Sequence, residues 1–204
     1  MRLFVLGATG AIGRHLLRIG LEREHQLTAF VRSPNKISQR SGLLKVVQGD
    51  VFNASQLTQC LAGHDCVLSA FGPTIIRATT LRREFGRTLA LSLRNSKVPR
   101  AEIVSAAFLF PNIGILGYFL TRTLFRQMAP DMAGMESEIM RSGIDWTIVR
   151  PPRLTNGPAT RAYRVTDDRL PKGGTIVSRA DVAEFMIGEA EKPEHLRRIV
   201  GVAL

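Results

Sequence analysis

Hydrophobic residues alternate along the chain between short continuous runs and longer stretches with a helical period. The continuous runs are typical of strands covered on both faces of a sheet, and they lie at residues 2–7, 26–32, 43–50, 65–72, 101–108, 145–152 and 197–204. The periodic stretches predict helices packed on that sheet, and they lie at residues 11–23, 55–63, within 79–96, 131–143 and 178–191. This order predicts an α/β fold, a doubly wound parallel sheet with helices on both faces.

The chain of 204 residues suits one α/β domain over residues 1–204 better than two small ones. No linker or internal repeat divides it, and residues 107–130 read as an irregular insertion on the substrate side of the sheet. The apolar part of this insertion, residues 107–120, is shorter than the about 20 residues that cross a bilayer, so no membrane span is expected. A buried segment, a pocket wall or a homodimer contact is the better interpretation.

Charge and cysteine content limit the partners and the cellular location expected for the protein. The formal net charge is +11, and seven basic residues against the single acid Glu84 lie between Arg77 and Arg100. Because only Phe85 is interleaved there to stack on bases, this segment is interpreted as a solvated basic helix face, and no specific nucleic acid partner is expected. Two cysteines cannot form a disulfide framework and no secretion signal precedes the first strand, so a cytoplasmic location is expected.

Three glycines mark the point where the first strand passes into the first helix. The spacing G-x-x-G-x-x-G at Gly7, Gly10 and Gly13 leaves the backbone uncovered at a tight turn. The unpaired amides at the start of a helix carry partial positive charge, and a diphosphate can approach them only where no side chain intervenes. The predicted contacts to a dinucleotide diphosphate are Gly7, Thr9, Gly10, Ala11, Ile12 and Gly13.

The end of the second strand predicts the choice of cofactor. Sites that prefer NAD usually place an acidic residue there to bind the ribose 2′-hydroxyl, but this chain has Arg32, followed by Ser33 and Lys36. A guanidinium binds a 2′-phosphate through paired, charge-assisted hydrogen bonds. NADPH is therefore expected as the cofactor in preference to NADH, and the alternative is a solvated arginine at a strand end.

Several segments together resemble a known family: "GATGAIG" (7–13), "VRSPNK" (31–36), "GDV" (49–51), "SAFGP" (69–73) and "SGIDWTIVRPPRL" (142–154). These motifs are similar to those of the atypical short-chain dehydrogenases/reductases with an NAD(P)H-binding domain. Within that group they look most like the branch of biliverdin and flavin reductases and the bacterial NADH-flavin reductase-like proteins. The resemblance covers nearly the whole chain and implies a single Rossmann-type domain.

The resemblance also implies further contacts to the cofactor. Asp50 and Val51 would flank the adenine, and the end of the fourth strand would pass beside the diphosphate and the nicotinamide ribose through Ala70, Phe71 and Gly72. Pro151 would lie near the nicotinamide, where Arg153 would contribute to one wall of the substrate pocket. For Pro151, simple termination of a strand is an equally good interpretation.

The chemistry expected of the site departs from that of alcohol dehydrogenases. Those enzymes use a serine and a Y-x-x-x-K pair as the acid/base group. Ser105 lies at the expected end of the fifth strand, but the candidate tyrosine, Tyr118, is followed four residues later by Arg122 rather than lysine. Ordinary alcohol oxidation is therefore not expected, and Ser105 and Tyr118 remain the catalytic candidates.

Reduction of a conjugated acceptor does not require the tyrosine–lysine acid/base pair that alcohol oxidation needs. Such an acceptor delocalises the charge that a hydride brings, so positioning it over the nicotinamide supplies most of the acceleration. Phe108 and Phe110 are candidates to line the pocket, or equally to form core or a dimer interface. The function expected is an NADPH-dependent reductase of a flavin-like or other conjugated small molecule.

Two other functions fit parts of the pattern. A non-catalytic NAD(P)-binding redox sensor would explain the missing tyrosine–lysine pair, and a nucleotide-sugar epimerase or dehydratase shares the glycine motif. The four histidines have no metal-ligand spacing, so no metal site is expected.

Overall fold

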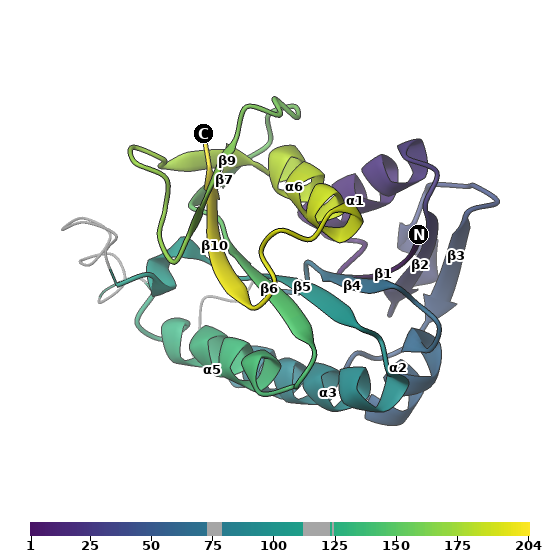
Figure 1. Cartoon of the computed structure of the whole chain (residues 1–204). Helices are drawn as coiled ribbons and strands as arrows, with labels where there is room; N and C mark the ends of the chain where they lie inside the picture. Colours follow the sequence, from purple (N-terminus) through teal and green to yellow (C-terminus); the bar gives the residue numbers. More distant parts are fainter. Residues whose placement is uncertain (73–78, 112–122, 124) are drawn as a thin grey trace.

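In a computed structural model of the protein, which describes residues 1–72, 79–111, 123 and 125–204, eight strands form one sheet. Figure 1 shows this sheet between two layers of helices. In spatial order the strands are β3 (Leu44–Gln48), β2 (Gln26–Val31), β1 (Arg2–Leu6), β4 (Cys66–Ser69), β5 (Arg100–Val104), β6 (Asp145–Arg150), β10 (Arg198–Ala203) and β8 (Arg164–Asp167). The predicted α/β sheet with helices on both faces is confirmed.

The helices cover the two faces of the sheet separately (Figure 1). One layer contains α1 (Ala11–Glu22) and α6 (Arg179–Glu191), and the other contains α2 (Ala54–Leu61), α3 (Leu81–Ser96) and α5 (Ala129–Met140). Each layer encloses its own apolar core. The first core includes Leu3 and Val5 of β1, and the second includes Phe4 and Leu6 of the same strand. Successive side chains of β1 therefore point to opposite faces, as a fully covered strand requires.

The strand order reverses direction at β1. From β1 the chain proceeds to β2 and β3 on one side and then returns to place β4 on the other. Ligands of doubly wound sheets bind at such a switch point, outside the carboxyl ends of the strands. We call this side of the sheet the carboxyl edge and the opposite side the amino edge.

The sheet is not parallel throughout. β8 pairs antiparallel with β10, with Gly201 opposite Thr166. β10, the last strand in the sequence, therefore lies inside the sheet, and β8 forms its edge. Residues 164–167 include a single apolar residue, Val165, and none of the four is fully buried, as is typical of a strand at the solvated edge of a sheet. A second, two-stranded parallel sheet joins β7 (Arg153–Thr155) to β9 (Ile176–Ser178) at the carboxyl edge.

Candidate functional site

The glycine turn brings β1, α1 and the end of β4 into backbone contact. Gly7 has a φ of +74°, and a Cβ atom there would lie 2.6 Å from the carbonyl carbon and oxygen of Ala70. A Cβ atom on Gly13 would lie 2.1 Å from the carbonyl oxygen of Gly7. Only glycine fits at these two positions, and the absence of side chains lets α1 begin directly above the end of β1.

The amino end of α1 has the properties of an anion site. Gly10 is the N-cap residue, so it offers no side chain to the amides of the first turn, and that turn contains no acidic residue. Gly10 and Ala11 are exposed, Thr9 is half-buried, and Ile12 is buried in the core. The first-turn amides carry partial positive charge and are left for a ligand to bind.

The end of β2 presents two cations to the same edge. Arg32 is exposed directly after β2, and its backbone carbonyl accepts a hydrogen bond of 3.4 Å from Gln48 Nε2. Ser33 is the N-cap residue of a short 3₁₀ helix, Pro34–Lys36. Within the described ranges, no acidic side chain pairs with the guanidinium of Arg32 or the ammonium of Lys36. The positive charge at the end of β2 is therefore not neutralised by an acid among the described residues.

The loops after β3 and β4 complete this side of the edge. Asp50 is exposed, and one of its carboxylate oxygens accepts a hydrogen bond of 3.1 Å from the amide of Phe52, whereas Val51 is buried. The ring of Phe71 lies 4.3 Å from that of Phe85, so this residue contributes chiefly its backbone to the edge. Ala70 is partly exposed beside Gly7, and Gly72 is exposed.

On the other side of the edge, the ends of β5 and β6 are joined by backbone hydrogen bonds. The amide of Ser105 donates to the carbonyl of Val149 at 2.7 Å, and the amide of Ala107 donates to the carbonyl of Pro151 at 3.0 Å. Ser105 is 6% exposed, and its hydroxyl has no hydrogen-bond partner among the residues described. A buried hydroxyl without a partner is unusual and identifies a place where a ligand atom could bind.

A buried ion pair lies at the end of β6. Arg150, the last residue of β6, donates hydrogen bonds of 2.9 Å from Nε and 2.5 Å from Nη2 to the two carboxylate oxygens of Glu136 in α5. Its guanidinium carbon also lies 4.8 Å from the centroid of the Phe110 ring, within the range of a cation–π contact. Sequence reasoning missed this pair, because α5 and β6 each contain other polar residues and nothing in the sequence marks Glu136 and Arg150 as buried partners.

The two aromatic residues proposed for the pocket occupy different environments. Phe110 is 4% exposed and packs against Arg150, whereas Phe108 is half-buried and stacks on Phe125 with a centroid separation of 4.7 Å. Arg153 is exposed at the start of β7. Tyr118 lies outside the described residues, as does most of the insertion that contains it.

A carboxylate fixes the loop that follows β7 to the start of α6. Asp181 Oδ1 accepts hydrogen bonds of 2.8 Å from the amides of both Thr160 and Arg161, and Oδ2 accepts from the hydroxyls of Thr160 and Ser178. Ser178 Oγ in turn accepts a hydrogen bond of 2.9 Å from the amide of Asp181. Ser178 is therefore the side-chain cap of α6, and Asp181 both contacts this cap and anchors residues 160–161.

Two classes of site find no support in the part of the chain that the structure describes. No group of three or more histidine, cysteine, aspartate or glutamate side chains could hold a metal ion there. None of the helices described combines the length and the apolar character needed to traverse a bilayer.

Comparisons with known proteins agree with this geometry. A model of the family described as NAD(P)H-binding matches residues 7–193. The chain is 27% identical to the uncharacterized protein YwnB of Bacillus subtilis, covering 96% of this chain and 94% of that protein. It is 26% identical to the oxidoreductase stcQ of Emericella nidulans, covering 96% and 80%. In structure it is similar to ChuY, an anaerobillin reductase of Escherichia coli O157:H7, with a TM-score of 0.80 at 19% identity, covering 100% and 97%.

Proposed function

The chain belongs to the NAD(P)H-binding family, and from this premise we propose that it is an NADPH-dependent reductase that transfers hydride to a flavin-like or other conjugated small molecule. The observation that carries this proposal is the glycine turn, where the uncapped start of α1 meets the loop after β4 without side chains between them. The names of two similar proteins, an oxidoreductase and an anaerobillin reductase, support the same class of reaction.

The residues present fit the proposed cofactor. The first-turn amides of α1 would bind the diphosphate, and Arg32 with Ser33 and Lys36 would bind the 2′-phosphate. Asp50 and Val51 would flank the adenine, while Ala70 and Gly72 would border the diphosphate. Bound NADPH would supply the hydride.

The reacting end of the site would be formed by β5 and β6. The carbonyl of Pro151 accepts a hydrogen bond from the amide of Ala107. Because this bond fixes its position, Pro151 would provide a rigid wall beside the nicotinamide. The hydroxyl of Ser105 is the buried polar group available to donate a hydrogen bond to the acceptor or to the nicotinamide amide. A conjugated acceptor delocalises the added charge, so orientation by these groups would supply most of the acceleration.

Steady-state oxidation of NADPH with FMN, riboflavin, a quinone and biliverdin tests the reaction. Turnover with at least one acceptor is expected, and Ser105→Ala should lower kcat by about tenfold because one hydrogen bond to the reacting groups is lost. Ser142→Ala is the matched control, since Ser142 is equally buried with an unpartnered hydroxyl in the described chain but lies at the amino edge. Absence of turnover with all four acceptors would contradict the proposal. Tight, equal binding of NADPH and NADP without turnover would instead favour a redox sensor.

Cofactor choice has its own test. Arg32→Asp should weaken NADPH binding by about a hundredfold and leave NADH binding within about threefold, because a carboxylate repels the 2′-phosphate but accepts a ribose hydroxyl. Arg169→Asp, the same charge change at an exposed site near β8, is the control and should change neither affinity. Isothermal titration calorimetry measures both constants. An unchanged ratio in Arg32→Asp would show that the phosphate does not bind at the end of β2.

A further inference from the structure

The second helix layer has a seam between α3 and α5, and the first half of this seam is rich in ion pairs. The two helices pack against each other in the lower layer of Figure 1. Arg82 of α3 lies 3.5 Å from the carboxylate of Asp131, which also accepts hydrogen bonds from the amides of Arg82 and Arg83. Arg83 lies 4.0 Å from Glu138. Arginines here face acids across the seam.

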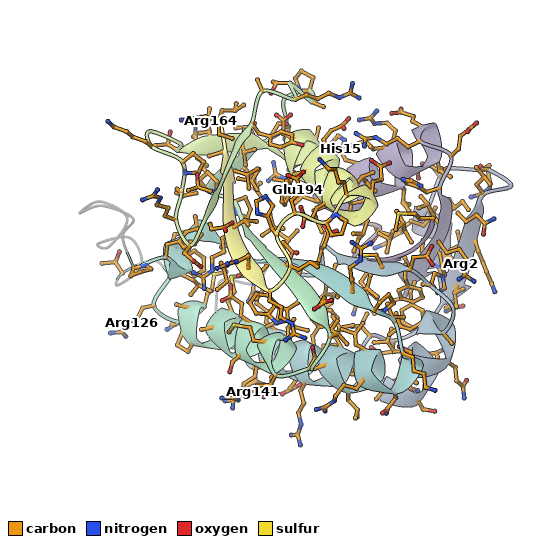
Figure 2. All side chains as sticks on the ribbon, in the orientation of Figure 1. Arg2, His15, Arg126, Arg141, Arg164 and Glu194 are labelled. Atoms are coloured by element: carbon orange, nitrogen blue, oxygen red, sulfur yellow. The ribbon has the colours of Figure 1, made fainter. Side chains whose placement is uncertain are left out.

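In the second half of the seam, arginines outnumber acids. A groove of about 220 Å³ lies between the helices, and its lining residues are Arg87, Ala90, Leu91, Arg94, Glu138 and Arg141. Three guanidinium groups therefore surround one carboxylate, and that carboxylate already faces Arg83. No ion-pair partner is recorded for Arg87, Arg94 or Arg141 within the described ranges. Figure 2 shows Arg141 on the outer side of this layer, directed away from the sheet.

Helix electrostatics accounts for only part of this arrangement. Arg94 lies in the last turn of α3 and Arg141 is the C-cap residue of α5, where a cation interacts favourably with the helix dipole. Arg87 lies in the middle of α3 and has no such partner. Residues 87, 91 and 94 are spaced by four and three positions, so they lie on one face of the helix. Arg87 and Arg94 on this face and Arg141 of the neighbouring helix line the same groove.

We propose that the groove between α3 and α5 binds a small phosphorylated anion, a diphosphate or a phosphate monoester, through Arg87, Arg94 and Arg141. Guanidinium groups match phosphate oxygens in paired, charge-assisted hydrogen bonds. The groove is smaller than the about 300–1,000 Å³ of sites for drug-sized ligands, so it suits a phosphate group with a short substituent. Leu91, which is 42% exposed, offers that substituent an apolar contact.

Two larger occupants fit the groove less well. A nucleic acid strand would gain from aromatic side chains on which bases stack, and none lines this groove. A second copy of the chain related by a two-fold axis would place the same arginines opposite one another, and their repulsion would oppose association.

The groove lies apart from the site of the proposed function. Arg94 and Arg141 are at the ends of helices that return the chain to the amino edge, whereas the glycine turn is at the carboxyl edge and across the sheet in the layer of α1. The inference therefore does not depend on the reductase proposal, and failure of one leaves the other standing.

The test is calorimetric titration of the whole protein with inorganic pyrophosphate and, separately, with glycerol phosphate; loss of binding on changing the groove arginines distinguishes the groove from any diphosphate site at α1. Saturable binding of at least one anion is expected. Arg87→Gln/Arg94→Gln should weaken it by about tenfold or more, because two charge-assisted contacts are lost. The tighter of the two anions identifies whether the groove takes a diphosphate or a monoester.

Arg169→Gln/Lys172→Gln is the matched control. It removes the same charge from exposed positions near β8 and should leave the affinity within about twofold. Thermal unfolding of each variant checks that it is folded. Failure of both anions to bind, or equal weakening in the two double variants, would overturn the proposal. Tighter binding of a short single-stranded oligonucleotide than of either small anion would also overturn it.

Discussion

Two buried glutamates, one at each edge of the sheet, differ in their partners. At the carboxyl edge, Glu136 is 2% exposed and accepts two hydrogen bonds from Arg150. Near the amino edge, Glu102 is 3% exposed, and one of its carboxyl oxygens has no partner among the described residues. The other carboxyl oxygen, Oε1, accepts a weak hydrogen bond of 3.8 Å from the thiol of Cys66. A cavity of about 10 Å³ beside Glu102 has room for one water molecule. The two edges therefore bury the same residue type in opposite electrostatic settings.

Glu102 stays protonated to a higher pH than an exposed glutamate does. Burial raises the pKa of Glu102 well above its ordinary value, the charge of Glu189 raises it further, and Arg100 acts in the opposite direction. Burial and the neighbouring Glu102 likewise raise the pKa of the Cys66 thiol. Near the amino edge, Glu102 is thus buried in its neutral form. At the carboxyl edge, by contrast, Arg150 and Glu136 form a charged pair, and the hydroxyl of Ser105 on the neighbouring strand has no partner in the described chain. The difference teaches that burial of a glutamate can serve packing alone, as at Glu102, or can hold an arginine at the end of a strand, as at Glu136.

The largest expected effect comes from the turn that makes the carboxyl edge accessible. Gly13→Ala should cost more than about 4 kcal/mol in the free energy of unfolding, because its Cβ would lie 2.1 Å from the backbone oxygen of Gly7. Dinucleotide binding should be lost with it. Gly188→Ala, in a helix with no atom within 4 Å of the added Cβ, is the control and should stabilise the protein by up to about 1 kcal/mol. Urea unfolding measures both, and similar values for the two variants would contradict this account.

Removing one member of the charged pair should have the next largest effect. Glu136→Gln leaves the guanidinium of Arg150 buried without a counter-charge, and we expect a loss of about 3 kcal/mol in the free energy of unfolding. The double variant Glu136→Leu/Arg150→Met should recover most of this loss, because it removes both charges together. Denaturant midpoints of the single and double variants provide the comparison. A loss below about 1 kcal/mol in the single variant would show that the pair is not electrostatically coupled.

The smallest effect is expected at the amino edge and has the opposite sign. Because the folded pKa of Glu102 is raised, its contribution to stability is complete below the ordinary glutamate pKa and is lost as pH rises through the folded pKa. In that window Glu102 should reduce the free energy of unfolding by about 1.4 kcal/mol per pH unit. Glu102→Gln, which mimics the neutral acid, should therefore be more stable than the wild type by an amount that grows with pH. Unfolding curves at several pH values would reveal a constant gap if Glu102 were ionised in the folded state.

Much of the fold followed from local patterns. The alternation of strands and helices and the glycine turn each depend on residues close together in sequence, so the sequence was sufficient to predict them. β8 was missed because residues 164–167 have no continuous apolar run, and their pairing with β10 is set by a partner more than thirty residues later.

The site was predictable only where it consists of backbone. The positions of Gly7 and Gly13 follow from the requirement for close approach, and the structure gives that approach as distances. The pairing of Arg150 with Glu136 and the second role of Asp181 depend on elements that meet only after folding. No spacing in the sequence distinguishes the buried Glu102 from an exposed glutamate, since its neighbours in β5 read as an ordinary strand.

The anchoring of Thr160 and Arg161 by Asp181 has a kinetic consequence for the loop that carries them. Two amides share one carboxylate oxygen and two hydroxyls share the other, so releasing one donor leaves the remaining geometry intact but release of the segment requires all contacts with residues 160–161 to break together. Arg161 also donates a hydrogen bond of 3.0 Å from Nη2 to Glu184 Oε1. Because two carboxylates of α6 hold this loop, its release is expected to be slower than that of a loop held by a single contact.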